Sequence, residues 1–210
     1  IQALYALESW PQASQLDPID GRYFPVPAGD MDALNEAIGP EIWALANDTD
    51  DKISRQAIAV LQRINPDKAK LNQAAGFVLD EKQRSVVRKE WLRLLRKWDL
   101  TLFTSVGAQA LTSNSPELRV VAAQELTEAE RGGTAVDNYL LATLKNSGDT
   151  VELQRAIKMI PRLTSKKYII EQLVKDLIAG RIAPEIQLEV LETATTISRD
   201  YPDLKMQLEH

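Results

Sequence analysis

Carboxylates are the side chains best able to do chemistry in this chain, which contains no cysteine and one histidine, His210. Asp48, Asp50 and Asp51 stand together before an expected helix, with a spacing that partly resembles that of calcium-loop ligands. The glycine and the distant glutamate of an EF-hand loop are missing. Carboxylates at a helix start also satisfy free N–H groups and interact favourably with the helix dipole. We therefore expect capping here, with calcium binding as the alternative.

The last three residues, Leu208-Glu209-His210, resemble a cloning remnant that leads into a polyhistidine tag. If they are a tag remnant, a histidine general base and a Ser-His-Asp triad are excluded. The sequence also contains no Walker-type loop, no dinucleotide-binding fingerprint and no Cys-x-x-Cys-His haem motif. We therefore expect no catalytic residue, no cofactor and no metal ligand. The chain begins with Ile1 inside a helical pattern, which indicates a piece of a longer protein.

Residues 81–98 form a strongly basic amphipathic segment that could bind an acidic partner, a membrane surface or nucleic acid. Its net charge is +5, from seven basic and two acidic residues. The alternative is a solvated outer face whose charge compensates the acidic residues 30–51. The candidate interaction surface consists of six basic residues and two aromatic residues of a preceding loop: Arg84, Arg88, Lys89, Arg93, Arg96, Lys97, Tyr23 and Phe24. Tyr23 and Phe24 are also expected to hold that loop against the helices.

The four tryptophans are Trp10, Trp43, Trp91 and Trp98. They could line a ligand groove, but we favour core packing because three of them fall on the apolar faces of expected helices.

Composition places the chain among ordinary globular proteins, with 44% hydrophobic and 26% charged residues. No run approaches the roughly 20 apolar residues that a membrane span needs, so no span is expected. The formal net charge is −5. Sequence-independent nucleic-acid binding depends on phosphate neutralisation, so this acidic balance disfavours nucleic acid as a partner.

Residues 147–180 are the clearest helix–turn–helix unit in the chain. Asp149 is expected to cap the first helix, and Glu152 to reach back and complete a capping box. Pro161 ends that helix, and Gly180 ends the second as a C′ residue. Helices are also expected over residues 30–47 (with a break at Gly39-Pro40), 50–64, 67–79, 81–98, 99–111, 117–129, 134–145 and 184–198.

A repeat runs through these helices. If Ile53, Val86, Leu118, Leu153 and Ile186 are equivalent positions, the steps between them are 33, 32, 35 and 33 residues. Such a period is the length of two helices with their turns and is typical of a stacked α-solenoid. The tetratricopeptide and ankyrin signatures are missing, which leaves a HEAT-like repeat. We therefore predict an all-α, right-handed solenoid of HEAT/ARM-like helix pairs, about five to six of them. An irregular helical bundle is the alternative.

The expected organisation is a single domain over residues 1–207, with a long loop at 11–29 and the tag remnant at 208–210.

Several segments resemble the HEAT-like region of large secreted bacterial quinoprotein dehydrogenases of the membrane-bound and glucose/sorbosone type. The segments are residues 3–10 (ALYALESW), 16–23 (LDPIDGRY), 25–27 (PVP) and 184–192 (PEIQLEVLE). In that family a β-propeller precedes the helical region and a cytochrome c module follows it, and the quinone and haem ligands lie in those other domains. The resemblance therefore implies export to the periplasm or beyond, no catalytic residue here, and a spacer or docking role.

Three hypotheses follow. The first is a non-catalytic scaffold within a multidomain redox protein, whose partners are the other domains of the parent or another protein. The second is a stand-alone module that binds a peptide or nucleic acid through residues 81–98. The third, least favoured, is an enzyme with a carboxylate in its groove.

Overall fold

The computed structural model describes residues 1–10, 22–23, 29–163 and 165–209 of the chain. Within these residues it contains twelve α-helices, one short 3-10 helix and no β-strand. The predicted all-helical class is confirmed. No helix in the described part is both long and apolar enough to cross a membrane.

The chain divides into two compact units, Ile1–Phe103 and Thr104–His210. The predicted single domain over residues 1–207 stays a prediction. The first unit contains α1 (Gln2–Ser9), α2 (Met31–Leu45), α3 (Asp51–Leu61), α4 (Lys68–Leu79) and α5 (Ser85–Trp98), and α6 (Leu100–Ala110) begins in it. The second unit contains the rest of α6, α7 (Pro116–Glu128), α8 (Gly133–Asn146), α9 (Thr150–Met159), η2 (Ile160–Arg162), α10 (Lys166–Ile178), α11 (Pro184–Ser198) and α12 (Pro202–Glu209).

Polar side chains cap three of the odd-numbered helices, and the caps at Asp50 and Asp149 are the expected ones. Asp50 caps α3, Ser115 caps α7 and Asp149 caps α9, each accepting backbone N–H groups of the first turn. Proline occupies the first position of α7 and α11, where its missing N–H costs nothing. Local sequence therefore defines these helix starts.

The break expected at Gly39-Pro40 does not occur, and α2 runs through both residues. Proline keeps a helical φ angle and removes only one backbone donor. The residue before a proline normally leaves the helix because its Cβ meets the proline ring, but Gly39 has no Cβ. The prediction of a break was wrong because a glycine precedes the proline.

In the first unit, α3 is the central helix and packs against α1, α2 and α5, and α5 also packs against α4. The core contains the fully buried side chains of Ile58, Leu61, Trp91, Leu92 and Leu95. Leu4 of α1 is also buried, at 5% exposed.

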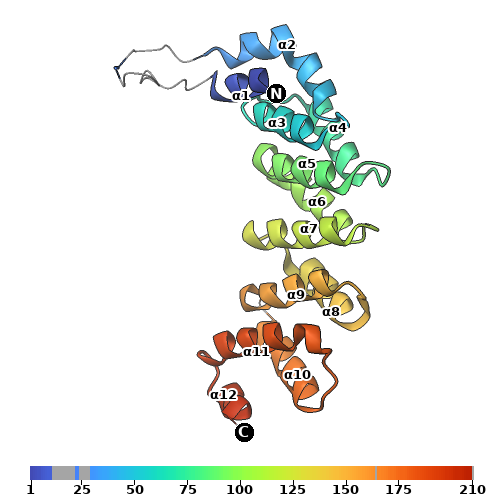
Figure 1. The fold of residues 1–210 in the computed structure, drawn as a ribbon, viewed down its shortest axis with the longest axis vertical. Helices are drawn as coiled ribbons and strands as arrows, with labels where there is room; N and C mark the ends of the chain where they lie inside the picture. Colours follow the sequence, from blue (N-terminus) through green and yellow to red (C-terminus); the bar gives the residue numbers. More distant parts are fainter. Residues whose placement is uncertain (11–21, 24–28, 164, 210) are drawn as a thin grey trace. The chain divides into compact units, whose positions relative to one another are not determined.

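In the second unit, α9 packs against α7, α8 and α11, and α10 packs against α11. Figure 1 shows α7, α9 and α11 following one another along this unit. The core contains the fully buried side chains of Leu118, Leu126, Leu140, Ile157 and Ile170. Within each unit, alternate helices therefore touch, which is compatible with an α-solenoid.

The positions chosen as equivalent in the sequence all lie near the starts of odd-numbered helices. Ile53 is in α3, Val86 in α5, Leu118 in α7, Leu153 in α9 and Ile186 in α11. The period of about 33 residues, read from the sequence, therefore corresponds to one helix pair.

Gly180 ends α10 with a φ of +69°, in the left-handed region where a side chain is strained. We expect Gly180→Ala to lower the free energy of unfolding by about 1 kcal/mol, because alanine must adopt this conformation. A Cβ at Gly180 would meet no other atom within 4 Å, so strain is the only cause. Urea unfolding followed by circular dichroism measures the change. Gly148→Ala, at a glycine with equal space and no positive φ, is the control and should cost less.

Candidate functional site

The acidic cluster before α3 acts as a cap. Asp50 Oδ1 accepts the N–H groups of Lys52 at 2.7 Å and Ile53 at 3.4 Å. Asp48 Oδ1 accepts the N–H of Asp50 at 2.8 Å. Asp51 forms an ion pair with Arg84. Among the described residues, no group of three or more His, Cys, Asp or Glu side chains could hold a metal ion. The expected capping role is confirmed, and calcium binding gains no support.

Arg88, which was included in the candidate interaction surface, is not on the surface. Its side chain is 2% exposed. Its Nε donates to the Val78 carbonyl at 2.7 Å, and its two Nη atoms donate to the Glu81 carboxylate at 2.9 Å each. These contacts hold the Arg88 side chain inside the fold, where it links α5 to α4 and to the α4–α5 connection. The charge pattern of the sequence did not reveal this inward orientation.

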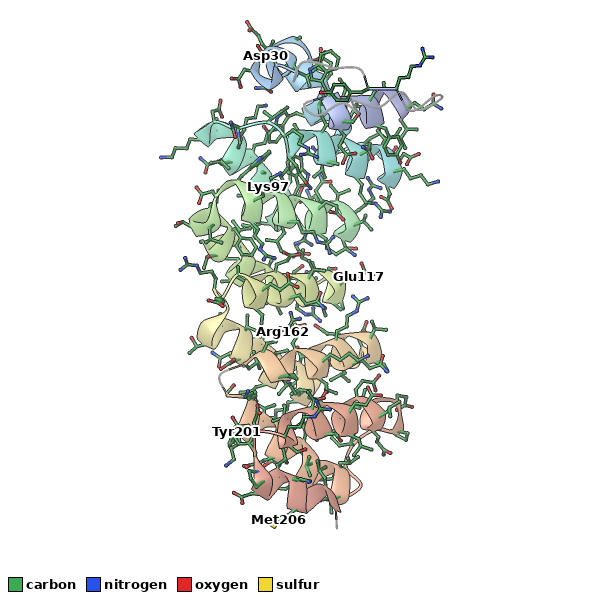
Figure 2. The ribbon with its side chains drawn as sticks, turned by 90° about the vertical axis from the view of Figure 1, so that its left-hand side faces the viewer. Asp30, Lys97, Glu117, Arg162, Tyr201 and Met206 are labelled. Atoms are coloured by element: carbon green, nitrogen blue, oxygen red, sulfur yellow. The ribbon has the colours of Figure 1, made fainter. Side chains whose placement is uncertain are left out.

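The other basic residues of this surface are largely engaged with nearby groups. Arg84 pairs with Asp51 and donates to the Thr49 carbonyl at 2.8 Å. Arg93 pairs with Glu90 at 2.9 Å. Lys89 and Arg96 also have interaction partners. Lys97 lies exposed on α5 (Figure 2). The ion pair of Arg84 with Asp51 joins the basic segment to the acidic residues before it, whereas Arg88 and Arg93 pair with carboxylates of their own segment.

Because Arg88 is buried, we expect its replacement to affect stability. Arg88→Met should lower the free energy of unfolding by about 2 kcal/mol, since it leaves the buried Val78 carbonyl without its donor. Arg93→Met removes an exposed pair on the same helix and should cost less than about 1 kcal/mol. Urea titrations of both variants measure the difference, and equal losses would contradict the structural role of Arg88.

Tyr23 does not form the expected anchor. Tyr23 is 63% exposed, so its side chain is not held in a core. Phe24 lies outside the described residues.

Three of the four tryptophans pack together in the first unit, as expected. The ring centroids of Trp43 and Trp91 lie 5.0 Å apart, and those of Trp43 and Trp98 lie 6.0 Å apart. Phe77 adds a ring 5.2 Å from Trp91. Trp10 is the exception, at 51% exposed. Trp43, Trp91 and Trp98 therefore form an aromatic cluster in the first unit.

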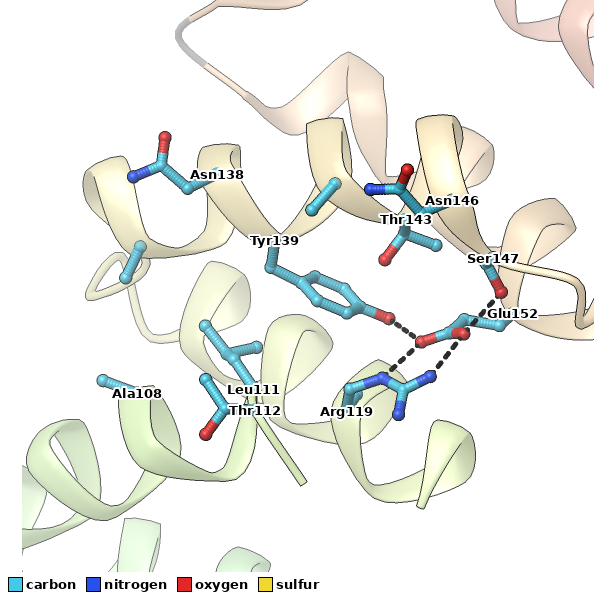
Figure 3. A pocket seen from close by; sticks show the side chains of 12 residues that line it. Ala108, Leu111, Thr112, Arg119, Asn138, Tyr139, Thr143, Asn146, Ser147 and Glu152 are labelled. Atoms are coloured by element: carbon cyan, nitrogen blue, oxygen red, sulfur yellow. Dashed lines mark hydrogen bonds and ion pairs between the residues drawn. The ribbon is translucent and has the colours of Figure 1, made fainter. Parts of the chain in front are cut away.

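A pocket lies in the second unit. Its volume is about 540 Å³, and residues from α6, α7, α8 and the start of α9 line it (Figure 3). Leu111 and Tyr139 supply much of its apolar lining, and Arg119 and Glu152 lie at one end. No residue of the predicted interaction surface is among its lining.

Glu152 is the chemically distinctive residue of this pocket, because its buried carboxylate accepts four hydrogen bonds. The residue is 2% exposed. Oε1 accepts from Arg119 Nε at 2.8 Å and from the Tyr139 hydroxyl at 2.9 Å. Oε2 accepts from Arg119 Nη2 at 2.7 Å and from the Ser147 hydroxyl at 2.8 Å. Its backbone N–H is capped by Asp149 at 2.8 Å. These contacts join α7, α8 and α9 at one point.

The surroundings keep Glu152 ionised. Burial alone would raise the pKa of its carboxyl, but hydrogen bonds from Arg119, Ser147 and Tyr139 outweigh burial and hold that pKa below its ordinary value. Its hydrogen bond with Glu152 raises the pKa of Arg119, and burial raises the pKa of Tyr139. A carboxylate whose pKa is lowered carries its charge at neutral pH, so it has no proton to donate as a general acid. Glu152 is therefore an anchoring anion.

The expected capping box is half correct. Asp149 caps α9, but Glu152 turns inward, and the N–H of Asp149 is accepted by the Ser147 hydroxyl at 3.1 Å. Sequence reasoning missed Glu152 as a tertiary contact. The available signal was that Arg119 precedes Glu152 by 33 residues, one repeat length.

The same contact position recurs one helix pair later. Arg119 and Gln154 each directly follow an equivalent position, Leu118 and Leu153. Gln154 Nε2 donates to the Glu185 carbonyl at 3.0 Å, at the start of α11. Arg119 reaches Glu152, which likewise directly precedes an equivalent position. In the second unit, α7 is thus hydrogen-bonded to the start of α9, and α9 to the start of α11.

Comparison with known proteins adds no relative. No protein-family model, no curated protein and no solved structure matches the chain.

Proposed function

We propose that this chain is a non-catalytic scaffold, a HEAT-like α-solenoid that holds domains in place or offers a surface to a protein partner. The observation that carries the proposal is the pair of equivalent contacts, Arg119 to Glu152 and Gln154 to the Glu185 carbonyl. Contacts that repeat with the helix pair, and that join each pair only to its neighbour, are the property that defines a solenoid.

The proposal extends this arrangement to the whole chain as a right-handed superhelix of about five to six helix pairs. In the first unit, α3 packs against α5, and Arg84 at the start of α5 pairs with Asp51 at the start of α3. That pair also spans 33 residues. The agreement of its sequence separation with the repeat length supports the same architecture there.

A scaffold role also accounts for the chemistry of the pocket. The hydrogen bonds of the Glu152 carboxylate come from Arg119 of α7, Tyr139 of α8 and Ser147 at the end of α8. Its lowered pKa leaves it without a proton to donate. The cluster of Arg119, Tyr139 and Glu152 thus holds helices together, and this supports a non-enzymatic role for the chain.

The parent that we propose is an exported, multidomain redox protein of the quinoprotein dehydrogenase and cytochrome c type. The support is the resemblance of residues 3–10, 16–23, 25–27 and 184–192 to that family. In such a parent, the partners of this chain are the propeller and cytochrome domains or another exported protein.

A stand-alone module acting through residues 81–98 is less well supported. Arg88 is buried, and Arg84 and Arg93 are paired with carboxylates, so the surface has less available charge than its sequence indicates.

Sequencing the complete gene tests the parent. The expected reading frame encodes an export signal and a propeller-type region before this chain, and a Cys-x-x-Cys-His motif after it. A frame with neither a propeller-type region nor that motif would contradict the proposed redox parent.

The scaffold role is tested in the full-length protein by replacing the pocket residue Tyr139 with Phe. Turnover with a soluble dye acceptor should be unchanged, and a loss of turnover while the fold is retained would indicate catalysis.

A further inference from the structure

The second unit has a surface that is unusual in this protein because it carries almost no charge. Residues 104–116 contain no acidic or basic side chain, although 26% of the whole chain is charged. On α8, the exposed positions Ala135, Asn138, Ala142 and Asn146 lie on one face and are all uncharged. Charge depletion of this kind marks the centre of protein–protein interfaces.

The odd-numbered helices of the same unit show the opposite composition. Exposed charged residues occur on α7, α9 and α11, including Glu128, Arg155, Lys158 and Glu192, and Arg162 follows α9 in η2. Arg162 and Glu128, for example, face each other at 3.8 Å on the surface. The absence of charge is therefore particular to the α6–α8 side and is not a property of the unit.

The pocket of about 540 Å³ lies in this uncharged surface. We name it the Tyr139 groove and define it by Ala108, Leu111, Asn138, Tyr139, Ala142 and Asn146. The ion pair at its end contributes no net charge, because the Arg119 and Glu152 side chains neutralise each other. A charged ligand group would lose its hydration here without gaining an opposite charge, which is costly. The groove therefore fits an uncharged occupant.

The polar groups on the rim favour a peptide. Asn138 and Asn146 are exposed and lie on the same side of α8. Eight helical positions separate them, which corresponds to about 12 Å at a rise of 1.5 Å per residue. An extended peptide covers that length in about three to four residues. Amide side chains both donate and accept hydrogen bonds, so they match the N–H and C=O groups of a peptide main chain.

We propose that the Tyr139 groove binds an uncharged, extended peptide segment of a protein partner. The segment inserts an apolar side chain between Ala108 and Ala142 against the Tyr139 ring. Asn138 and Asn146 hold its main chain on either side. This inference rests on the proposed scaffold function and names the surface and the kind of partner.

A selection with the full chain and a random-peptide display library tests the proposal. Enriched peptides should contain few acidic or basic residues and a shared apolar position. Fluorescence anisotropy with a labelled selected peptide should show at least tenfold weaker binding to Ala142→Arg, which fills the groove and adds charge. Asn138→Asp, which adds a charge at nearly constant size, should also bind at least tenfold more weakly. Thr195→Arg, at an exposed position of α11, should bind like the unsubstituted chain.

Circular dichroism and thermal unfolding identify any variant that fails to fold, and Asn138→Asp keeps the test valid if Ala142→Arg is such a variant. The proposal is overturned if no peptide is enriched or if the enriched peptides are highly charged. It is also overturned if folded groove variants bind as well as the Thr195→Arg control. None of these results bears on the proposed redox parent, because the parent is tested by the sequence of the complete gene and not by peptide binding to the groove.

Discussion

Replacing Glu152 with glutamine is expected to destabilise the α7–α9 region by about 3 to 4 kcal/mol, which would be one of the largest effects of any single substitution. The Glu152 carboxylate is 1% exposed and pairs with the partly buried Arg119 at 2.7 Å. Glutamine keeps the shape but removes the negative charge, so the guanidinium loses its counter-charge and Tyr139 and Ser147 lose an anionic acceptor. Hydrogen exchange of the backbone amides of α7, α8 and α9 measures the loss.

Glu185→Gln is the matched control. Glu185 directly precedes an equivalent position at the start of α11, but it is exposed and only its backbone carbonyl contacts Gln154. We expect a change below about 0.5 kcal/mol for this control. If both substitutions had the same effect, the buried ion pair would not hold the helices together.

The same pair determines how stability changes with acid. The folded pKa of Glu152 is lowered, and the ordinary value for glutamate is about 4.3. The ion pair therefore contributes its full stabilisation above the unfolded pKa, and this contribution is lost as pH falls through the folded pKa. Glu152→Gln should lack this acid-dependent loss, so the two proteins should differ less at low pH than at pH 7. Urea titrations across that range measure the difference.

Replacing Trp91 with alanine is expected to lower the free energy of unfolding by about 3 to 5 kcal/mol. Trp91 is 0% exposed, stacks on Trp43 and donates from Nε1 to Asn47 Oδ1 at 3.3 Å. Alanine leaves a cavity among these rings and removes a hydrogen bond. Urea unfolding followed by far-ultraviolet circular dichroism measures the change without depending on the deleted fluorophore.

Trp10→Ala is the control, because it deletes the same side chain from a position that is 51% exposed. Its cost should be well below that of Trp91→Ala, since much less apolar surface returns to water. Similar losses at the two positions would show that the ring cluster of Trp43, Trp91 and Trp98 does not dominate the core.

Helix positions could be read from the sequence because their causes are local. Asp50 and Asp149 cap the following turn, and Gly180 supplies the left-handed conformation that ends α10. Each of these effects acts within a few residues, so the printed sequence contains the information needed. The break at Gly39-Pro40 failed for an equally local reason, the missing Cβ of the glycine.

The candidate site could not be read in the same way. Arg88 belonged to a basic run and was taken for a surface residue, yet it lies buried beside Glu81. Glu152 fitted a capping box and instead joins three helices. A charged side chain is several atoms long and rotates freely, so sequence spacing does not determine which neighbour it reaches.

The sequence by itself determined that this chain is helical, where most of its helices lie, and that the starts of alternate helices from α3 to α11 recur with a period near 33 residues. Backbone hydrogen bonding and the alternation of apolar and polar positions act within one or two turns, and both are visible in the residue order. Only the tertiary structure decided that Glu152 is a buried, ionised anchor and that an uncharged groove lies beside it. The burial and the counter-charge of Glu152 come from helices that are separated in the chain. Burial and counter-charge determine whether an ionisable side chain stays charged, so residue order alone does not reveal its role.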